Sequence, residues 1–412
     1  KLYYIYMREF NRSKPHSFNR GNGGRFGRPA SRFGKPARRG FSGESIAHAR
    51  YIKKAAPVAE QPEFTPKHTF NDFGFPEIIA RGIEAKGYTK PTPIQDEAIA
   101  PIMEGRDVVA IANTGTGKTA TFLLPILSKM FTDRTLKALV LIPTRELAVQ
   151  VDDELRGFSR NMQIRSVLTM GGASITQQMH LLRKNPQFVI ATPGRLKDLI
   201  NRRAINLAQF KVVVLDEVDR MVDIGFLPDV RMIVGHLAEE RQSLFFSATV
   251  TPEIDSIIRT FAKEPVKISV RTQETAATID QDVVKVEHGK EKLWKLFDIA
   301  RDRAHNKILV FVRTKRGADQ LSNDLYDEGF HVAAIHGDRS QGQRTRALAD
   351  FKNGKIRMLV ATDVAARGID IPDVSLVINY DEPGTYADYV HRIGRTGRAG
   401  KQGKALTFVV GR

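Results

Sequence analysis

Residues Ala112–Thr119 read Ala-Asn-Thr-Gly-Thr-Gly-Lys-Thr and continue the apolar run Val108–Ala112. This order predicts a buried strand that leads into a phosphate-binding loop and then into a helix. Gly115 and Gly117 allow the tight turn that points backbone N–H groups toward phosphate oxygens. The N-terminus of the following helix adds positive charge toward the same anion. The pattern therefore favours nucleotide binding over a chance glycine-rich turn.

Two side chains at the end of this loop have the chemistry of a nucleotide site. Lys118 can reach the β- and γ-phosphates, and the Thr119 hydroxyl can bind Mg²⁺. The general phosphate-loop pattern begins with Gly, whereas this loop begins with Ala112. The match to the general pattern is therefore incomplete at its first position.

An acidic pair follows a second apolar strand about a hundred residues later. Asp216 and Glu217 come directly after the run Val212–Leu215. Ligands of open α/β sheets bind at the carboxyl ends of strands. Asp216 is therefore placed to hold Mg²⁺, and Glu217 to polarise an attacking water. Such a pair is also common at an exposed helix start, but together with the phosphate loop it predicts nucleotide hydrolysis.

The composition of the chain points to a polyanionic partner. The 412 residues carry a formal net charge of +18, and the pI is near 10.0. A balance this basic is typical of nucleic-acid binding, although a basic tail alone would also produce it. The absence of cysteine excludes disulfides and thiolate metal sites and favours a cytoplasmic location. No apolar run is long enough to span a membrane, so we expect no membrane partner.

The first 60 residues hold most of this charge and are low in complexity. They contain 14 Lys and Arg against 3 acidic residues, a net +11 that leaves +7 for the rest of the chain. Arg25–Ala30 (Arg-Phe-Gly-Arg-Pro-Ala) is nearly repeated at Arg32–Ala37. This composition predicts a disordered basic tail over residues 1–64. Phe interleaved with cations suits single-stranded nucleic acid, and a plain solubilising tail is the alternative.

From residue 65 onward, apolar strands alternate with amphipathic helices, which indicates α/β domains with mostly parallel sheets flanked by helices. The alternation stops at the polar residues 270–281, which we interpret as a linker. The sequence therefore predicts two tandem domains, over residues 65–269 and 282–412, of which only the first has a phosphate loop. The expected strands are Val108–Ala112, Ala138–Ile142, Phe188–Thr192, Val212–Leu215 and Leu244–Phe246 in the first domain, and Val283–Val286, Ile308–Val312, Val332–Ile335, Met358–Thr362, Ser375–Asn379 and Ala405–Val410 in the second.

The second domain carries a basic motif near its end. Arg392, Arg395 and Arg398 recur every three residues after His391, with glycines between them. Guanidinium groups stabilise the charge on a transferring γ-phosphoryl group. We therefore interpret the motif as an arginine finger, so that hydrolysis would require the two domains to close. The alternative is a basic, turn-rich stretch without a specific ligand.

With these motifs in this order, the chain resembles the DEAD-box ATP-dependent RNA helicases of superfamily 2 over about residues 68–410. The resemblance implies two tandem RecA-like domains, ATP and Mg²⁺ as cofactors, and RNA as the macromolecular partner. We expect a monomer, and the sequence does not identify protein partners. The motifs that carry the resemblance beyond the phosphate loop and the arginines are Gly87–Gln95, Pro143–Leu147, Gly171–Gly172, Thr192–Arg195, Asp216–Asp219, Ser247–Thr249, Val310–Arg313, Gln341–Arg344 and Ala361–Asp370.

The resemblance also implies roles for individual positions. The catalytic set would be Lys118, Asp216, Glu217, His391, Arg395 and Arg398, with Thr119 and Asp216 on Mg²⁺. The nucleotide would contact Phe70, Gln95, Thr114, Gly115, Thr116, Gly117, Lys118, Thr119, Gly368 and Asp370, with Phe70 and Gln95 at adenine and Asp370 at ribose. Asp219, Ser247 and Thr249 would couple the ATP state to RNA. The RNA path would be lined by Arg145, Gly172, Thr192, Gly194, Arg195, Arg313, Gln341, Arg344, Thr362 and Asp363.

Two features depart from the family's pattern. Val218 stands where the name motif has Ala. We expect its side chain to point away from the metal and leave the carboxylates in place, and overpacking that slows hydrolysis is the alternative. The chain also stops at Arg412, just after its last strand, where the family has a further helix, so we expect that it is truncated or unusually short.

The function that the resemblance implies is RNA-stimulated ATP hydrolysis coupled to local, largely sequence-independent unwinding or remodelling of RNA. An ATP-gated RNA clamp without unwinding would use the same residues. A DNA helicase would share the core fold, and the motif around Gln95 argues against it only by resemblance.

Overall fold

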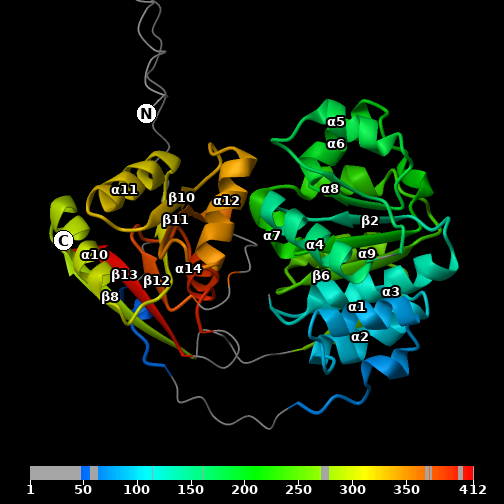
Figure 1. Cartoon of the computed structure of the whole chain (residues 1–412), viewed down its shortest axis with the longest axis horizontal. Helices are drawn as coiled ribbons and strands as arrows, with labels where there is room; N and C mark the ends of the chain where they lie inside the picture. The colour runs from blue at the N-terminus through cyan, green and yellow to red at the C-terminus, as the bar shows by residue number, and fades with distance from the viewer. Residues whose placement is uncertain are drawn as a thin grey trace, which may run out of the picture. The chain divides into compact units, whose positions relative to one another are not determined.

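The structure is a computed structural model that describes residues 48–55, 64–113, 115–160, 162–270, 278–366, 371, 374–397 and 402–411. Thr114, Gly368, Asp370 and Arg398 lie outside the described residues, as do residues 1–47 of the expected basic tail. The described residues form two α/β lobes (Figure 1). Within these ranges no helix combines the length and the apolar character needed to cross a membrane.

The first lobe contains a seven-stranded sheet with the strand order β3-β4-β2-β5-β6-β1-β7. Every neighbouring pair in it is parallel, as the alternation of elements predicts. The strands are β1 (Val108–Ile111), β2 (Ala138–Leu141), β3 (Ser166–Thr169), β4 (Phe188–Ala191), β5 (Val212–Asp216), β6 (Gln242–Ser247) and β7 (Val266–Ser269). The helices are α1 (Glu77–Ala85), α2 (Pro93–Met103), α3 (Lys118–Thr132), α4 (Arg145–Phe158), α5 (Ile175–Leu182), α6 (Pro193–Asn201), α7 (Val218–Ile224), α8 (Leu227–Val234) and α9 (Pro252–Phe261).

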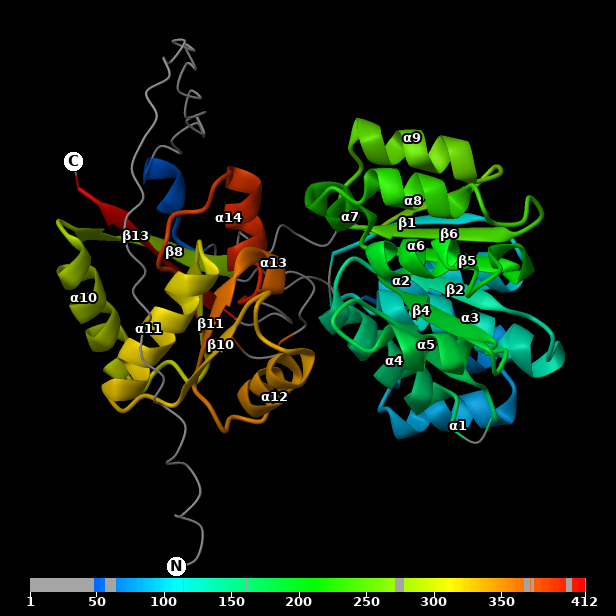
Figure 2. The same ribbon diagram turned by 90° about the horizontal axis from the view of Figure 1, so that it is seen from above.

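Alternate residues of these strands pack into two separate cores because successive side chains point to opposite faces of a sheet. Val212 and Val214 belong to the core under α1 to α4, whereas Val213 and Leu215 belong to the core under α6 to α9. Figure 2 shows the helices on both sides of this sheet. Burial on both faces explains why the central strands read as continuous apolar runs rather than as alternating ones.

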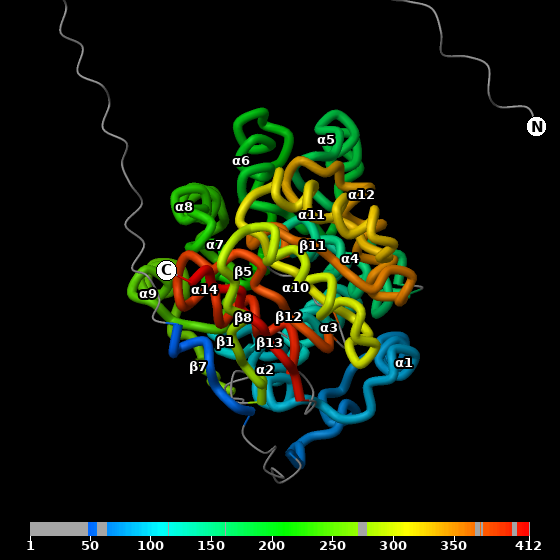
Figure 3. The backbone as a smooth tube through the Cα atoms, turned by 90° about the vertical axis from the view of Figure 1, so that its left-hand side faces the viewer, coloured from blue at the N-terminus to red at the C-terminus, as the bar shows by residue number. Residues whose placement is uncertain are grey.

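The second lobe contains a six-stranded sheet with the order β10-β11-β9-β12-β13-β8, again with every neighbouring pair parallel. Helices α10 and α11 cover one face, in front of the strands in Figure 3, and α12 to α14 cover the other. The strands are β8 (Ile279–Val286), β9 (Ile308–Val312), β10 (Val332–Ile335), β11 (Met358–Thr362), β12 (Leu376–Asn379) and β13 (Gly403–Val410). The helices are α10 (Gly289–Arg301), α11 (Lys315–Asp327), α12 (Gln341–Lys352), α13 (Asp363–Ala366) and α14 (Tyr386–Ile393).

The strand predictions fail at sheet edges. β3 and β7 are missing from the prediction, and β8 begins at Ile279, inside the predicted linker 270–281. All three are edge strands. In β8, partly exposed or exposed polar residues such as Asp280 alternate with buried ones, so the segment reads as polar and irregular. An edge strand buries fewer side chains than a central one, which weakens its apolar signal.

The predicted extent of the disordered tail, residues 1–64, is also wrong at one segment. Residues 48–55, which we call the strap, include a 3₁₀-helix at His48–Tyr51 and pack on the second lobe. Tyr51 is completely buried there. A single buried aromatic ring, that of Tyr51, anchors the segment. The average composition of the tail does not distinguish this residue from its neighbours.

Candidate active site

The phosphate loop adopts the geometry that its glycines predict. Gly115 and Gly117 have φ values of 84° and 92°, in the left-handed region that favours glycine, and Gly117 caps the N-terminus of α3. Lys118 is buried, and its Nζ donates to the carbonyl oxygen of Ala112 at 3.0 Å. The lysine therefore lies over its own loop, where incoming phosphate oxygens would compete with that carbonyl.

The sheet order brings three distant motifs to one edge. β5, β6 and β1 are neighbours, with Asp216 paired to Phe246 and Ile111 paired to Ser247. Because the strands are parallel, their carboxyl ends lie at the same edge of the sheet. A pocket at this edge is lined by Gly115, Gly117, Lys118, Thr119, Asp216 and Glu217.

Asp216 fits the role of a cation ligand. Burial raises the pKa of this carboxyl to about 7, although Lys118 nearby favours the charged form. Its Oδ1 is buried without a hydrogen-bond partner among the described residues. A carboxylate oxygen and the Thr119 hydroxyl are the hard donors that Mg²⁺ prefers. The residues present therefore fit a magnesium ion at this point.

Glu217 is held by a residue that the sequence analysis missed. It has a φ of 55° and immediately precedes α7. Its Oε2 accepts a hydrogen bond from Arg220 Nη1 at 2.6 Å, and both side chains are buried. This ion pair fixes one carboxylate oxygen of Glu217. The spacing of three residues at the start of a helix was the available signal for it.

Asp219 connects the acidic motif to the end of β6. Its Oδ2 accepts from the backbone N–H groups of Ala248 and Thr249 at 3.0 and 3.2 Å. Its own N–H donates to Ser247 Oγ at 3.3 Å, and that hydroxyl donates to the Thr249 carbonyl at 2.7 Å. The structure thus brings together the three residues that the resemblance assigns to coupling.

Gln95 and Phe70 are both buried, and Gln95 lies beside the phosphate loop. Gln95 Oε1 accepts from Thr92 N at 2.9 Å, and its Nε2 donates to the Gly117 carbonyl at 3.1 Å. Thr92 Oγ1 donates to the Thr116 carbonyl at 2.8 Å. Phe70 is buried and meets Tyr88 edge-on, with ring centroids 6.2 Å apart. The motif that the resemblance places at adenine thus supports the loop directly.

The expected RNA contacts of the first lobe gather at the ends of β2, β4 and β3, which are neighbours in the sheet. Arg145 begins α4, and its guanidinium lies so close to Gly172 that a Cβ there would be 2.2 Å from Nη1. Thr192 caps α6, near whose start Gly194 lies. Arg195 Nη1 donates to the Ala173 carbonyl at 3.1 Å and to Gln178 Oε1 at 2.9 Å.

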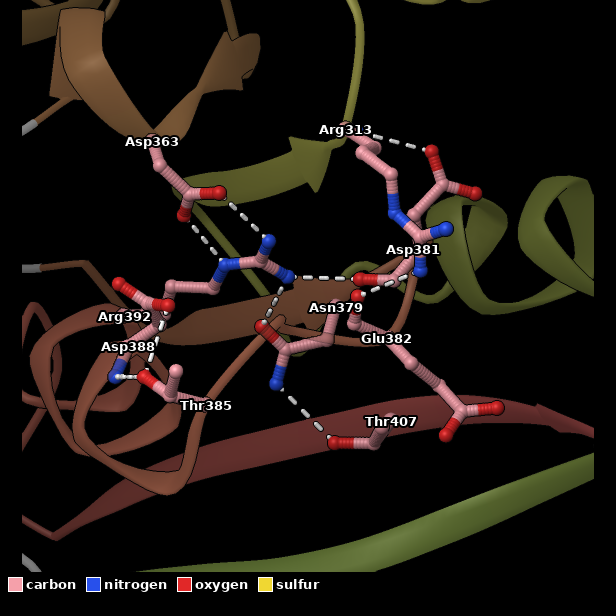
Figure 4. Close-up of polar contacts among 9 residues, drawn as sticks. All are labelled: Arg313, Asp363, Asn379, Asp381, Glu382, Thr385, Asp388, Arg392 and Thr407. Carbon is pink, nitrogen blue, oxygen red and sulfur yellow. Dashed lines mark hydrogen bonds and ion pairs between the residues drawn. The ribbon is translucent and has the colours of Figure 1, made fainter. Parts of the chain in front are cut away.

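In the second lobe Arg392 is the centre of a polar network (Figure 4). Its guanidinium binds both carboxylate oxygens of Asp363, at 2.5 and 2.8 Å, and donates to the Asp381 carbonyl at 2.6 Å. It also donates to Asn379 Oδ1 at 3.3 Å. The interpretation of the motif as an arginine finger therefore does not hold for Arg392. Its guanidinium connects the strand ends through these hydrogen bonds.

The other expected residues of this lobe lie at strand ends and in or next to α12 and α14, and Arg313 joins the network. Arg313 donates its backbone N–H to Asp381 Oδ2 at 2.9 Å. Thr362 and Asp363 follow one another at the end of β11. Gln341 and Arg344 lie in the first turn of α12, which Ser340 caps. His391 lies in the last turn of α14, and Arg395 follows its end.

Comparison with known proteins decides the family. The sequence profile of the DEAD/DEAH box helicase family matches residues 92–257, and that of the helicase conserved C-terminal domain matches residues 290–400. The chain belongs to the DEAD-box RNA helicase family. It is 46% identical to the ATP-dependent RNA helicase CshA of Listeria monocytogenes and 43% identical to the DEAD-box ATP-dependent RNA helicase 30 of Arabidopsis thaliana, over 83% of its own length in each case. It spans 66% and 59% of those two relatives.

Solved DEAD-box structures resemble both lobes. Mss116p bound to single-stranded RNA and AMP-PNP matches 85% of the chain, and the chain covers 77% of that protein, with a TM-score of 0.75 and 29% identity. S. cerevisiae Dbp5 bound to RNA and ADP BeF3 matches 84% of the chain and is covered to 90%, with a TM-score of 0.73 and 31% identity. These likenesses confirm the predicted pair of RecA-like lobes.

The raised pKa of Asp216 in this DEAD-box site predicts a pH-dependent stability. Burial raises the folded-state pKa from 3.8 to about 7, so between these values the folded protein keeps a proton that the unfolded chain loses. The free energy of unfolding of the metal-free protein should therefore fall as pH rises from about 4 to 7, with this group's effect constant above that. Relative to the parent, Asp216→Asn should become increasingly stable from pH 5 to pH 7 and keep that stability difference at pH 8, measured by thermal melting in EDTA. A stability difference between Asp216→Asn and the parent that does not change with pH would contradict the raised pKa of Asp216.

Proposed function

We propose that this chain is an RNA-stimulated ATPase that couples ATP hydrolysis to local unwinding or remodelling of RNA. The observation that carries the proposal is the bonding of Asp219 to residues 247–249, next to the buried Asp216 and Glu217. One rigid cluster thus includes the catalytic carboxylates and the segment at the end of β6. Because Asp219 bonds to residues 247–249, a shift of the carboxylates on ATP binding or hydrolysis can be transmitted to the segment after β6.

The proposed chemistry uses residues with distinct tasks. Lys118 would exchange its bond to the Ala112 carbonyl for the β- and γ-phosphates. Glu217, oriented by Arg220, would orient and polarise the attacking water. Asp216 and Thr119 would hold Mg²⁺, which when bound neutralises charge on the β- and γ-phosphate oxygens. Arg395 and Arg398 would stabilise the transferring group when the two lobes close, so ATP and RNA would favour each other's binding.

The decisive experiment compares ATP turnover with and without single-stranded RNA, beside strand displacement on a short duplex. We expect turnover to rise with RNA and strands to separate only with ATP. Turnover without displacement would identify a clamp instead. Equal stimulation by a 2′-deoxy strand would contradict RNA selectivity, because the 2′-hydroxyl is the constant difference along the backbone.

We also propose that Asp216–Asp219 is a variant of the family's name motif in which Val218 is tolerated. Val218 is buried in the core that contains Met221 and Ile254, away from the pocket side chains. Val218→Ala should therefore lower the free energy of unfolding by about 1 kcal/mol and leave ATP turnover within about twofold. Denaturant unfolding and ATPase assays measure the two effects, and Val213→Ala in the same core is the matched control. A large loss of turnover in a folded Val218→Ala protein would contradict this view.

Deleting residues 1–43 should weaken RNA binding without lowering the maximal ATPase rate. These residues carry 11 Lys and Arg against one Glu, whereas every motif of the site lies beyond residue 68. Cationic residues bind phosphates with counterion release, so the deletion should also make the salt dependence of binding shallower. RNA titrations at several salt concentrations measure both effects. Unchanged affinity and salt slope would show that this segment does not bind RNA.

A further inference from the structure

The strap precedes the first lobe in the sequence but packs on the second lobe. Residues 48–55 precede the first lobe in the chain, yet they pack on β8 of the second lobe, where Figures 1 and 2 show the blue segment beside that strand. Lys53 and Gln281 form an antiparallel bridge with N–H to carbonyl distances of 3.0 and 2.8 Å. Because β8 is an edge strand, the strap covers backbone groups that the sheet leaves open at this point.

Tyr51 anchors the strap. Its side chain is completely buried, and its ring centroid lies 4.7 Å from that of Tyr389 in α14. The same apolar cluster contains Ile279 of β8 and Ile393 of α14. The Tyr51 hydroxyl is buried without a hydrogen-bond partner among the described residues. The ring, and not the hydroxyl, therefore provides the attachment.

The contacts on either side of Tyr51 are peripheral. The Arg50 guanidinium lies 5.5 Å from the centre of the Tyr386 ring at the start of α14. His48 lies 3.7 Å from Glu382, and Lys54 lies 3.3 Å from Asp280. Most of these side chains are well exposed, and exposed ion pairs contribute little. We therefore expect these contacts to contribute little to the binding of the strap, and the buried Tyr51 ring to contribute most of it.

The strap contacts α14 directly through Tyr51 and Arg50, and β8, with which the strap pairs, contacts the arginine motif at two further points. Tyr389 lies one turn before Arg392 on α14, and its hydroxyl donates to Gln281 Oε1 at 3.0 Å, on the residue that pairs with the strap. At the other end of the motif, Gly397 approaches Ile279 so closely that a Cβ would lie 2.7 Å from Ile279 Cγ1. Tyr51 and Gln281 thus support the helix before Arg395, and Ile279 of β8 lies against the turn after it.

We propose that the strap positions α14 and the arginine motif for ATP hydrolysis, with Tyr51 as the positioning residue. The inference rests on the proposed function, because ATP turnover is the activity that the arginine motif would serve. It predicts that loss of the Tyr51 ring changes the catalytic rate more than the binding of ATP, since the nucleotide loop belongs to the first lobe.

The test uses full-length Tyr51→Ala, Tyr51→Phe and Ile52→Ala proteins, together with deletions of residues 1–43 and 1–55. Ile52 is the matched control because its side chain is 51% exposed on the same segment. At saturating RNA, Tyr51→Ala and the longer deletion should lower kcat about 3- to 10-fold with KM for ATP within about twofold. Tyr51→Phe, Ile52→Ala and the shorter deletion should retain the parental kcat. A peptide of residues 44–57 should restore the rate of the longer deletion, and the same peptide with Tyr51→Ala should not.

Hydrogen exchange of the α14 amides provides a readout independent of catalysis. Exchange should accelerate in Tyr51→Ala and in the longer deletion, and not in Ile52→Ala. Unchanged exchange in Tyr51→Ala would overturn the docking of the strap. Faster exchange with a parental kcat would overturn its positioning role. A parent protein without RNA-stimulated turnover would instead refute the proposed function, and hydrogen exchange would then still decide whether the strap holds α14.

Discussion

Replacing Glu217 by Gln should reduce RNA-stimulated ATP turnover by at least about 100-fold, the lower range for loss of a general base. The amide keeps the size of the side chain and can still accept the hydrogen bond from Arg220, which lies 2.6 Å from the carboxylate in the parent. It cannot polarise water as a carboxylate does. Binding of ATP and RNA should persist, so that the variant accumulates as a complex with both ligands.

Single-turnover ATPase kinetics and RNA retention in the presence of ATP would measure these two effects. Glu104→Gln, at an exposed position that follows α2, is a matched control and should behave as the parent. A parental rate in Glu217→Gln would assign the water-polarising role to another residue. Loss of ATP binding together with turnover would show that Glu217 mainly maintains the pocket.

Lys118→Ala should abolish useful ATP binding. Lys118 is the cation of the phosphate loop, and its buried side chain donates from Nζ to the Ala112 carbonyl at 3.0 Å. Removing one partner of a buried charge pair costs about 2–5 kcal/mol, so we expect ATP to bind at least about 30-fold more weakly. RNA binding without nucleotide should change little.

Titration with a fluorescent ATP analogue measures this loss, and Lys184→Ala, on an exposed turn, is the control for removal of a positive charge. Lys118→Arg keeps the positive charge but changes the shape of the group that carries it. Because a planar guanidinium does not replace a compact ammonium in a tight loop, this variant tests the geometry separately from the charge. Parental ATP affinity in Lys118→Ala would refute the assignment of the loop.

The sequence predicts the parts of this site that are contiguous along the chain. The phosphate loop and Asp216 are recognisable because their residues have a fixed spacing after an apolar strand, and parallel pairing then brings them to one edge. The destination of Arg392 was not predictable in this way. Its partners Asp363 and Asn379 lie at the ends of different strands, and only the sheet order makes those strand ends converge.

The strap shows a second reason for failure. Tyr51 is one aromatic residue in a polar, basic context, and no periodic pattern distinguishes it from the exposed Ile52 beside it. Its burial depends on Ile279 and Tyr389, which lie hundreds of residues away. Local composition cannot identify the position at which tertiary packing prevails.

Because the strap completes the second lobe, that lobe is discontinuous in sequence, and this has a consequence during synthesis. Tyr51 is translated 342 residues before Ile393, the end of its docking helix. At rates of about 5–20 residues per second, the strap would wait roughly 17–70 s for its site, while the whole first lobe is made and folds. A protein that starts at residue 64, or a second lobe expressed alone from residue 278, would be made without the strap. Tyr51 would then have to be supplied as a separate piece.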